Sequence, residues 1–156
     1  MTVTRCLGVD PGLKGAVALW DSEMGFLVVQ DMPSVKTGKN YVISEGLLAD
    51  MIRRLDPQQA WVELVHAMPK QGVVSTFNFG LGFGLVRGVI TALGVPLHLV
   101  HSRVWKGAYG LRRDKRDSRV IAARLFPSFA REFSRVKDDG KAEAALIALY
   151  GAERQG

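Results

Sequence analysis

The stretch CLGVDPGLKGAVALWD, residues 6–21, decides the fold. Its first part, CLGVD, is apolar over the length of a strand and ends at a Pro-Gly turn directly after Asp10. GAVALWD at 15–21 alternates like a second strand, and FLVVQ at 26–30 makes a third. Because only short connections separate these segments, they predict an antiparallel meander at the start of the sheet.

The segments that follow alternate between helix and strand. Apolar residues recur at helical spacing from Ile43 to Leu55, and Asp56 with the following proline stops the pattern. AWVELV at 60–65 and VPLHLV at 95–100 are apolar runs of strand length, separated by about one long helix. This β-α-β-α-β order favours parallel strands.

After His101 the sequence predicts helices only. They are expected around 104–105, near 116–126 and near 138–152. The whole pattern predicts an α/β domain with a five-stranded mixed sheet, three strands antiparallel and two parallel, and helices on both faces.

Size and composition indicate one compact domain spanning 1–156, with 47% hydrophobic residues available for a core. The single cysteine, Cys6, lies in an apolar run and indicates a buried thiol in a reducing compartment. The N-terminus does not resemble a signal peptide, and Arg87, Pro96 and several glycines interrupt the most apolar segment, 72–100, so we expect no membrane span. These features predict a cytoplasmic protein.

Positive charge is concentrated in one part of the chain. The sequence has 21 Lys and Arg against 15 Asp and Glu, and residues 102–141 alone hold twelve basic against five acidic side chains. The rest of the chain is close to neutral. This distribution suggests a polyanionic partner, although the alternating charges at 113–117 also suit a solvated helical face.

Acidic side chains occur at three places where a metal site can form. Asp10 ends the first strand, and Glu63 lies in an otherwise apolar strand, where an ionised carboxylate is costly unless it is paired, solvated or bound to a metal. Asp138, Asp139 and Glu143 open the last helix, with Asp139 and Glu143 on one face. Oxygen ligands of this kind suit Mg²⁺ or Mn²⁺.

Each acid also has a structural explanation. Asp10 before Pro-Gly suits turn chemistry, and Asp138 suits a helix N-cap, which is the interpretation we favour for it. Glu63 would need a buried basic partner, and none is close in sequence. Glu63 is therefore the strongest independent indication of a functional site.

Four blocks resemble, in order and spacing, the RuvC-like Holliday junction resolvases, particularly phage-type members: LGVDPG at 7–12, WVELVHAMPKQGVVSTFNFG at 61–80, VWK at 104–106 and DDGKAEAALIALYG at 138–151. The resemblance implies a ribonuclease H-like fold, a homodimer, and four acids that hold two Mg²⁺ or Mn²⁺ ions. By matching position, Asp10 and Glu63 are the first two acids.

The other two acids depart from the family pattern. Bacterial RuvC closes its site with two aspartates three residues apart, and no Asp-x-x-Asp occurs near the end of this chain. Glu143 aligns with the last of them, and its partner would fall on Gly140. We therefore transfer that role to Asp139, one helical turn before Glu143, and keep Asp138 as a reserve ligand.

The activity implied by the resemblance is an endonuclease that resolves Holliday junctions or other branched DNA and leaves paired symmetric nicks. In two-metal-ion hydrolysis one ion activates water and the other stabilises the leaving 3′ oxygen, so no histidine or serine nucleophile and no nucleotide cofactor is needed. His66 and His101, each near a strand end, are better explained by packing or hydrogen bonding.

Basic residues between the last strand and the final acids are the expected contacts to the DNA backbone, and they are interleaved with Trp105 and Tyr109. They are Lys106, Arg112, Arg113, Lys115 and Arg116.

Gly80, Gly84 and Gly88 share one face of the long helix at 75–93. They permit either tight packing on the sheet or close contact between two subunits, which a two-fold symmetric junction would require. Phe77 and Phe79 suit either stacking on unpaired bases or anchoring in the core.

Three other functions fit parts of the sequence. A nuclease of RNA-DNA hybrids or flaps would share the fold and the acids, and a non-enzymatic binder of branched DNA would not need them. The sugar kinase and actin-like ATPase fold also starts with a Gly-x-Asp-x-Gly turn, but the 156-residue length argues against its two domains.

Overall fold

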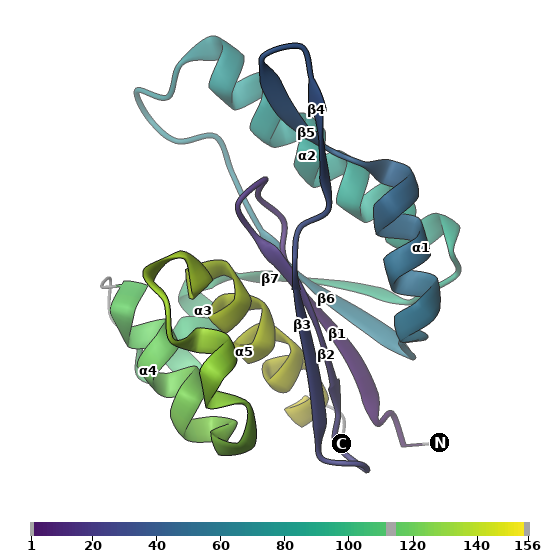
Figure 1. Ribbon diagram of the computed structural model, residues 1–156, viewed down its shortest axis with the longest axis vertical. Coiled ribbons are helices and arrows are strands. Elements are labelled where there is room, and N and C mark those ends of the chain that lie inside the picture. The colour runs from purple at the N-terminus through teal and green to yellow at the C-terminus, as the bar shows by residue number, and fades with distance from the viewer. Residues whose placement is uncertain (1, 112–114, 155–156) are drawn as a thin grey trace.

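The computed structural model describes residues 2–111 and 115–154, and a five-stranded mixed sheet lies at its centre (Figure 1). The strand order is β3-β2-β1-β6-β7, with the bounds β1 Arg5–Asp10, β2 Ala16–Asp21, β3 Phe26–Asp31, β6 Gln59–Leu64 and β7 Leu97–His101. Strands β1, β2 and β3 are antiparallel, and β6 and β7 run parallel to β1. The predicted sheet is confirmed.

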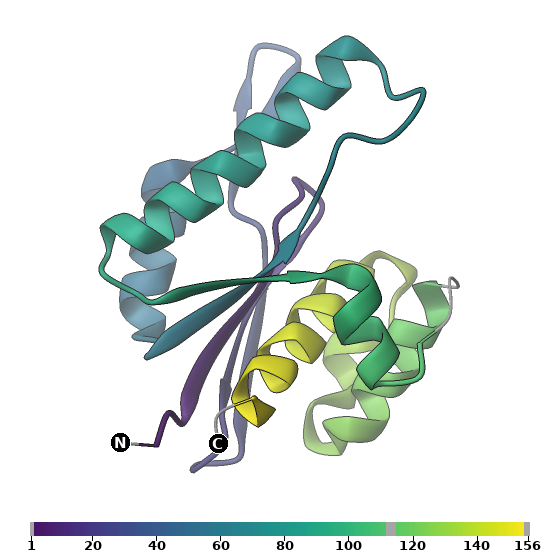
Figure 2. The ribbon, with the colours of Figure 1, turned by 180° about the vertical axis from the view of Figure 1, so that it is seen from behind.

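Helices cover both faces of this sheet, as the sequence predicts (Figure 2). One face carries α1 Glu45–Leu55 and α2 Val73–Ala92, and the other carries α3 Ser102–Ala108, α4 Lys115–Leu125 and α5 Asp139–Glu153. Two short 3-10 helices, η1 Pro127–Phe133 and η2 Val136–Asp138, precede α5. Side chains of β2 alternate between two buried cores, with Val17 and Leu19 under α1 and α2 and Ala16 and Ala18 under α5.

The small residues on one sheet face let α5 pack very closely. A Cβ atom on Gly8 of β1 would lie 2.2 Å from the Ala144 carbonyl oxygen and 2.3 Å from the Ala148 nitrogen. Gly8 therefore has to be glycine for steric reasons. This contact fixes the position of α5, and with it Glu143, against the strand that carries Asp10.

The ends of α1 follow from its sequence. The Ser44 hydroxyl accepts a hydrogen bond from the Leu47 backbone N–H, and Asp56 adopts a left-handed conformation (φ 47°) beyond the last turn. The predicted stop at Asp56 is confirmed.

A second, two-stranded sheet was not expected from the sequence. β4 Ser34–Thr37 and β5 Asn40–Ile43 form an antiparallel hairpin with Thr37 opposite Asn40. Gly38 (φ 63°) occupies the first of the two turn positions, which is the glycine preference of a type II′ hairpin. The Gly-Lys pair between two short alternating runs was the signal that would have predicted it.

Helix α2 packs less tightly than the sequence suggested. Nothing lies within 4 Å of a Cβ built on Gly80, Gly84 or Gly88, so their predicted tight packing on the sheet is wrong. By length and composition alone α2 is apolar enough to cross a membrane, contrary to expectation, although Val86 and Ile90 anchor it in the core of the domain.

Candidate active site

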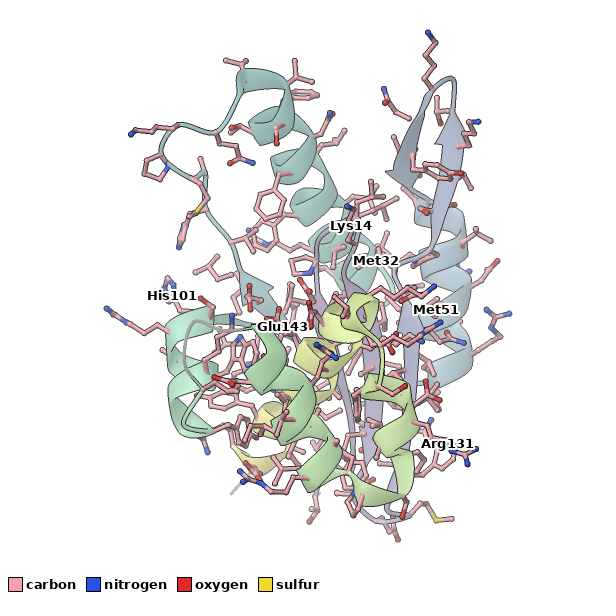
Figure 3. The ribbon with its side chains drawn as sticks, turned by 60° about the vertical axis from the view of Figure 1, so that its left-hand side comes forward. Lys14, Met32, Met51, His101, Arg131 and Glu143 are labelled. Atoms are coloured by element: carbon pink, nitrogen blue, oxygen red, sulfur yellow. The ribbon has the colours of Figure 1, made fainter. Side chains whose placement is uncertain are left out.

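Three of the predicted acids come from elements that the fold brings together. Asp10 ends β1 and Glu63 lies in the parallel neighbour β6, where Val9 pairs with Val62, so the two acids lie at the same level of the sheet. Glu143 lies on α5, which packs across β1. Figure 3 shows Glu143 beside the end of the sheet, near Lys14, whereas His101 lies off to one side.

The electrostatics of Asp10 reflect its burial and the nearby acids. Burial, together with the negative charges of Glu143 and Glu63, raises the pKa of Asp10 from its ordinary 3.8 to about 8. A backbone N–H from Gly12 and the positive charge of Lys106 act in the opposite direction but are weaker. Carboxylates that repel each other in this way are a feature of cation sites and catalytic centres.

Glu63 is held by a buried tryptophan. The indole Nε1 of Trp105, a fully buried side chain in the middle of α3, donates a 2.8 Å hydrogen bond to the Glu63 Oε2 atom. This hydrogen bond offsets part of the desolvation cost of placing a carboxylate in an apolar strand. One partner of Glu63 that the sequence did not reveal is therefore an indole from α3.

The two acids of α5 each pair with a cation. The Lys106 Nζ atom lies 3.3 Å from the Glu143 Oε1 atom and also 5.3 Å from the centre of the Trp105 ring. Arg119 Nε donates to Asp139 Oδ1 at 2.9 Å, and both side chains are partly buried. Lys106 thus belongs to the acid cluster itself, and Arg119 is a neighbour that the sequence did not single out.

Asp138 lies at the predicted N-cap position of α5, but its side chain has another role. Its side chain is 1% exposed and accepts hydrogen bonds from the Arg135 backbone N–H at 2.8 Å and from the Arg135 guanidinium at 2.9 Å. Burial alone would raise the pKa of Asp138, but these bonds and the charge of Arg135 lower it. Asp138 stands at the N-cap position of α5 without a side-chain cap bond; it closes the 3-10 turn η2, so we leave it out of the ligand set.

An open cavity of about 560 Å³ lies over the acids. Asp10, Asp139 and Glu143 line it, together with residues from the β1–β2 turn and from the end of β3. Lys14 and Lys137, both exposed, lie on its wall. The cavity gives a phosphate group access to three of the predicted acids.

The donor set suits a hard divalent cation, since it consists of carboxylate oxygens that repel each other. Among residues 2–111 and 115–154, however, no three Asp, Glu, His or Cys side chains are grouped as a ready metal cage. Instead, Lys106 neutralises Glu143 and Arg119 neutralises Asp139. The chemistry fits Mg²⁺ or Mn²⁺, and binding would require these two cations to release their acids.

The structure says less about the other predicted site residues. His66 and His101 stack on each other, with ring centroids 5.3 Å apart, and neither lines the cavity. Of the predicted DNA contacts, Arg112 and Arg113 lie outside the described residues. Lys115 and Arg116 begin α4, and only their backbone is described.

Replacing Trp105 by phenylalanine tests the role of its N–H group. We expect Trp105→Phe to weaken Mn²⁺ binding about 10-fold, because the Glu63 carboxylate loses the group that orients it. Calorimetric titration of Mn²⁺ into the folded variant measures this. Unchanged Mn²⁺ affinity together with lower thermal stability would show that Trp105 only fills the core.

Sequence comparison finds no relative: no family model matches the chain, and no curated protein matches it significantly. Solved structures do match. Thermus thermophilus RuvC superposes with a TM-score of 0.60 at 17% identity, covering 93% of this chain and 91% of RuvC. The same protein in complex with a Holliday junction substrate gives 0.61 at 18% identity, covering 94% and 90%.

A eukaryotic structure matches as well. The yeast mitochondrial Holliday junction resolvase Ydc2 superposes with a TM-score of 0.56 at 13% identity, covering 94% of this chain and 78% of Ydc2. Together with the sheet order and the helices on both faces, these matches show that the chain has the ribonuclease H-like fold of the RuvC-type Holliday junction resolvases.

Proposed function

We propose that this protein is a metal-dependent endonuclease that resolves branched DNA, with the Holliday junction as its substrate. The observation that carries the proposal is the convergence of Asp10, Glu63 and Glu143 from β1, β6 and α5, where burial and then the charges of Glu143 and Glu63 raise the pKa of Asp10 to about 8. The RuvC structure with a Holliday junction supports the choice of substrate.

In the proposed mechanism, Asp10, Glu63, Asp139 and Glu143 hold two Mg²⁺ or Mn²⁺ ions. When bound, such ions supply an activated water and stabilise charge on the phosphate and on the leaving oxygen. The protein contributes the positions of its carboxylates: Trp105 orients Glu63, and the close packing of α5 on Gly8 sets Glu143. Lys106, released from Glu143, would contact the DNA phosphate.

We also propose that two copies pair through α2, so that two sites can nick a symmetric junction. Val73, Val74, Phe77 and Leu81 are between 57% and 86% exposed on this helix. The exposure of Phe77 argues against a role as a core anchor. The open face at Gly80, Gly84 and Gly88 would allow two helices to approach closely.

Gly84→Leu tests this pairing. Since nothing lies within 4 Å of a Cβ at Gly84, the fold should persist while the larger side chain keeps the helices apart. Light scattering is expected to give a dimer for the wild type and a monomer for the variant. A wild-type monomer at micromolar concentration, or a variant that remains a dimer, contradicts the proposed interface.

The substrate class is tested by a panel of labelled nucleic acids with Mg²⁺ or Mn²⁺. A four-way junction, a flap, a duplex and an RNA-DNA hybrid are offered to the wild type and to Glu63→Gln. We expect the wild type to cut the junction and the variant to cut nothing. Preference for the hybrid or the flap would assign a different nuclease of this fold, and junction binding without cleavage would assign a binding protein.

A further inference from the structure

The β4–β5 hairpin stands out from the body of the protein (Figure 1). Every β4 residue and three of the four β5 residues are exposed, and only Ile43 at its base is buried. A two-stranded hairpin with so little buried surface is at best marginally stable in water. Its side chains are therefore available for a partner.

The charge of the hairpin has one sign. Lys36 and Lys39 are exposed, and residues 34–43 contain no Asp or Glu. Neither lysine makes an ion pair with any residue in the part of the chain that the structure describes. Tyr41, opposite Lys36 in the register and 56% exposed, adds an aromatic group beside this charge.

The hairpin begins at the active-site cavity. Ser34, the first residue of β4, lines that cavity together with Lys14 and Lys137. In Figure 3 the hairpin rises from the region where Lys14 and Met32 lie. With a rise of about 3.3 Å per strand residue, its tip lies roughly 13 Å from Ser34. Exposed lysines thus extend from the cavity wall to the tip.

We infer that the β4–β5 hairpin is a second DNA-binding element, which contacts backbone phosphates of the duplex arm that leaves the active site. This inference rests on the proposed function. Two exposed, unpaired lysines on a hairpin that itself holds no Asp or Glu suit a polyanion, and a two-stranded ribbon has the width that a major groove admits. The DNA contacts expected from the sequence lay only in 106–116.

Salt dependence of junction binding tests the inference, because it counts phosphate contacts. The double variant Lys36→Gln/Lys39→Gln is compared with the wild type by fluorescence anisotropy, with EDTA present to prevent cleavage. Loss of two contacts should reduce the log-log salt slope by about 1.8. The ratio of wild-type to variant affinity should then fall about 12-fold between roughly 50 and 200 mM salt.

Two controls separate the contact from a general charge effect. Lys36→Arg/Lys39→Arg keeps the charges and should keep the wild-type slope. Arg53→Gln/Arg54→Gln removes the same amount of charge from the last turn of α1. This turn contacts Arg5, so it lies at the opposite end of β1 from Asp10. The salt slope should therefore stay unchanged.

The outcomes distinguish this inference from the proposed function. If the wild type cuts junctions and the Gln double variant keeps the wild-type slope, the hairpin inference is wrong and the nuclease assignment stands. If the variant becomes monomeric by light scattering, the hairpin is a subunit contact and the inference is wrong. If the wild type neither binds nor cuts branched DNA, both are wrong.

Discussion

Asp10→Asn is expected to abolish cleavage and, at the same time, to stabilise the metal-free protein. Cleavage should fall on the order of 10³-fold, because the variant loses the carboxylate that interacts with both Glu63 and Glu143. Stability should rise because asparagine removes a buried carboxylate that its neighbours repel. We expect the free energy of unfolding to rise by about 1 to 2 kcal/mol at about pH 8.5, a value reduced because solvent screens part of the repulsion at this partly exposed site.

The pH dependence of this gain gives the sharper test. Burial and like charges raise the pKa of folded Asp10 to about 8, whereas the unfolded chain has the ordinary 3.8. Between these values the folded state binds more protons, so wild-type stability declines as pH rises and the decline ends above about 8. Melting curves in EDTA should show a gap between variant and wild type that widens from about pH 5 to about pH 8.5. A gap that is constant, or that widens toward acid, contradicts this assignment.

Gly8→Ala is expected to cause the largest loss of stability. Its new Cβ would lie 2.2 Å and 2.3 Å from two backbone atoms of α5, which cannot move aside as a flexible side chain can. The helix would have to leave the sheet, at a cost of about 3 kcal/mol or more. Because Glu143 precedes the contacted residue Ala144, metal binding and cleavage should fall as well.

Gly46→Ala is the matched control for this substitution. Gly46 lies in the first turn of α1, and nothing lies within 4 Å of a Cβ at that position. Its unfolding free energy should change by less than about 1 kcal/mol, in the stabilising direction. Urea unfolding curves measure both variants. Equal stability of Gly8→Ala and wild type would show that α5 does not depend on this contact.

The elements with a strong local pattern were predictable from the sequence. The three antiparallel strands, the two parallel ones and the stop of α1 at Asp56 all follow from hydrophobic patterning and turn residues, and the structure confirms them. The β4–β5 hairpin was missed because its strands are short and nearly fully exposed, so they lack a buried face to create a pattern. Its Gly38 turn was the only local signal.

The sequence singled out the acids that the fold brings together, but it did not reveal the side chains that contact them. Glu63 is conspicuous as a charge in an apolar strand, but its hydrogen bond comes from Trp105, which is 42 residues away. Asp138 stands at the predicted N-cap position of α5, but its side chain accepts hydrogen bonds from Arg135 in the preceding turn and not from the helix N–H groups. Such partners depend on tertiary contacts, which no local pattern encodes.

The central claim is that the carboxylates around Asp10 cut branched DNA with the help of a divalent cation. Cleavage of a synthetic four-way junction, labelled in turn on each strand and resolved on a denaturing gel, measures this most directly. Wild-type protein with Mg²⁺ or Mn²⁺ should give paired nicks at symmetric positions in two opposing strands, while EDTA or the Glu63→Gln substitution should give none. Full cleavage by Glu63→Gln, or an intact junction with bound wild-type protein under both metals, would contradict the account.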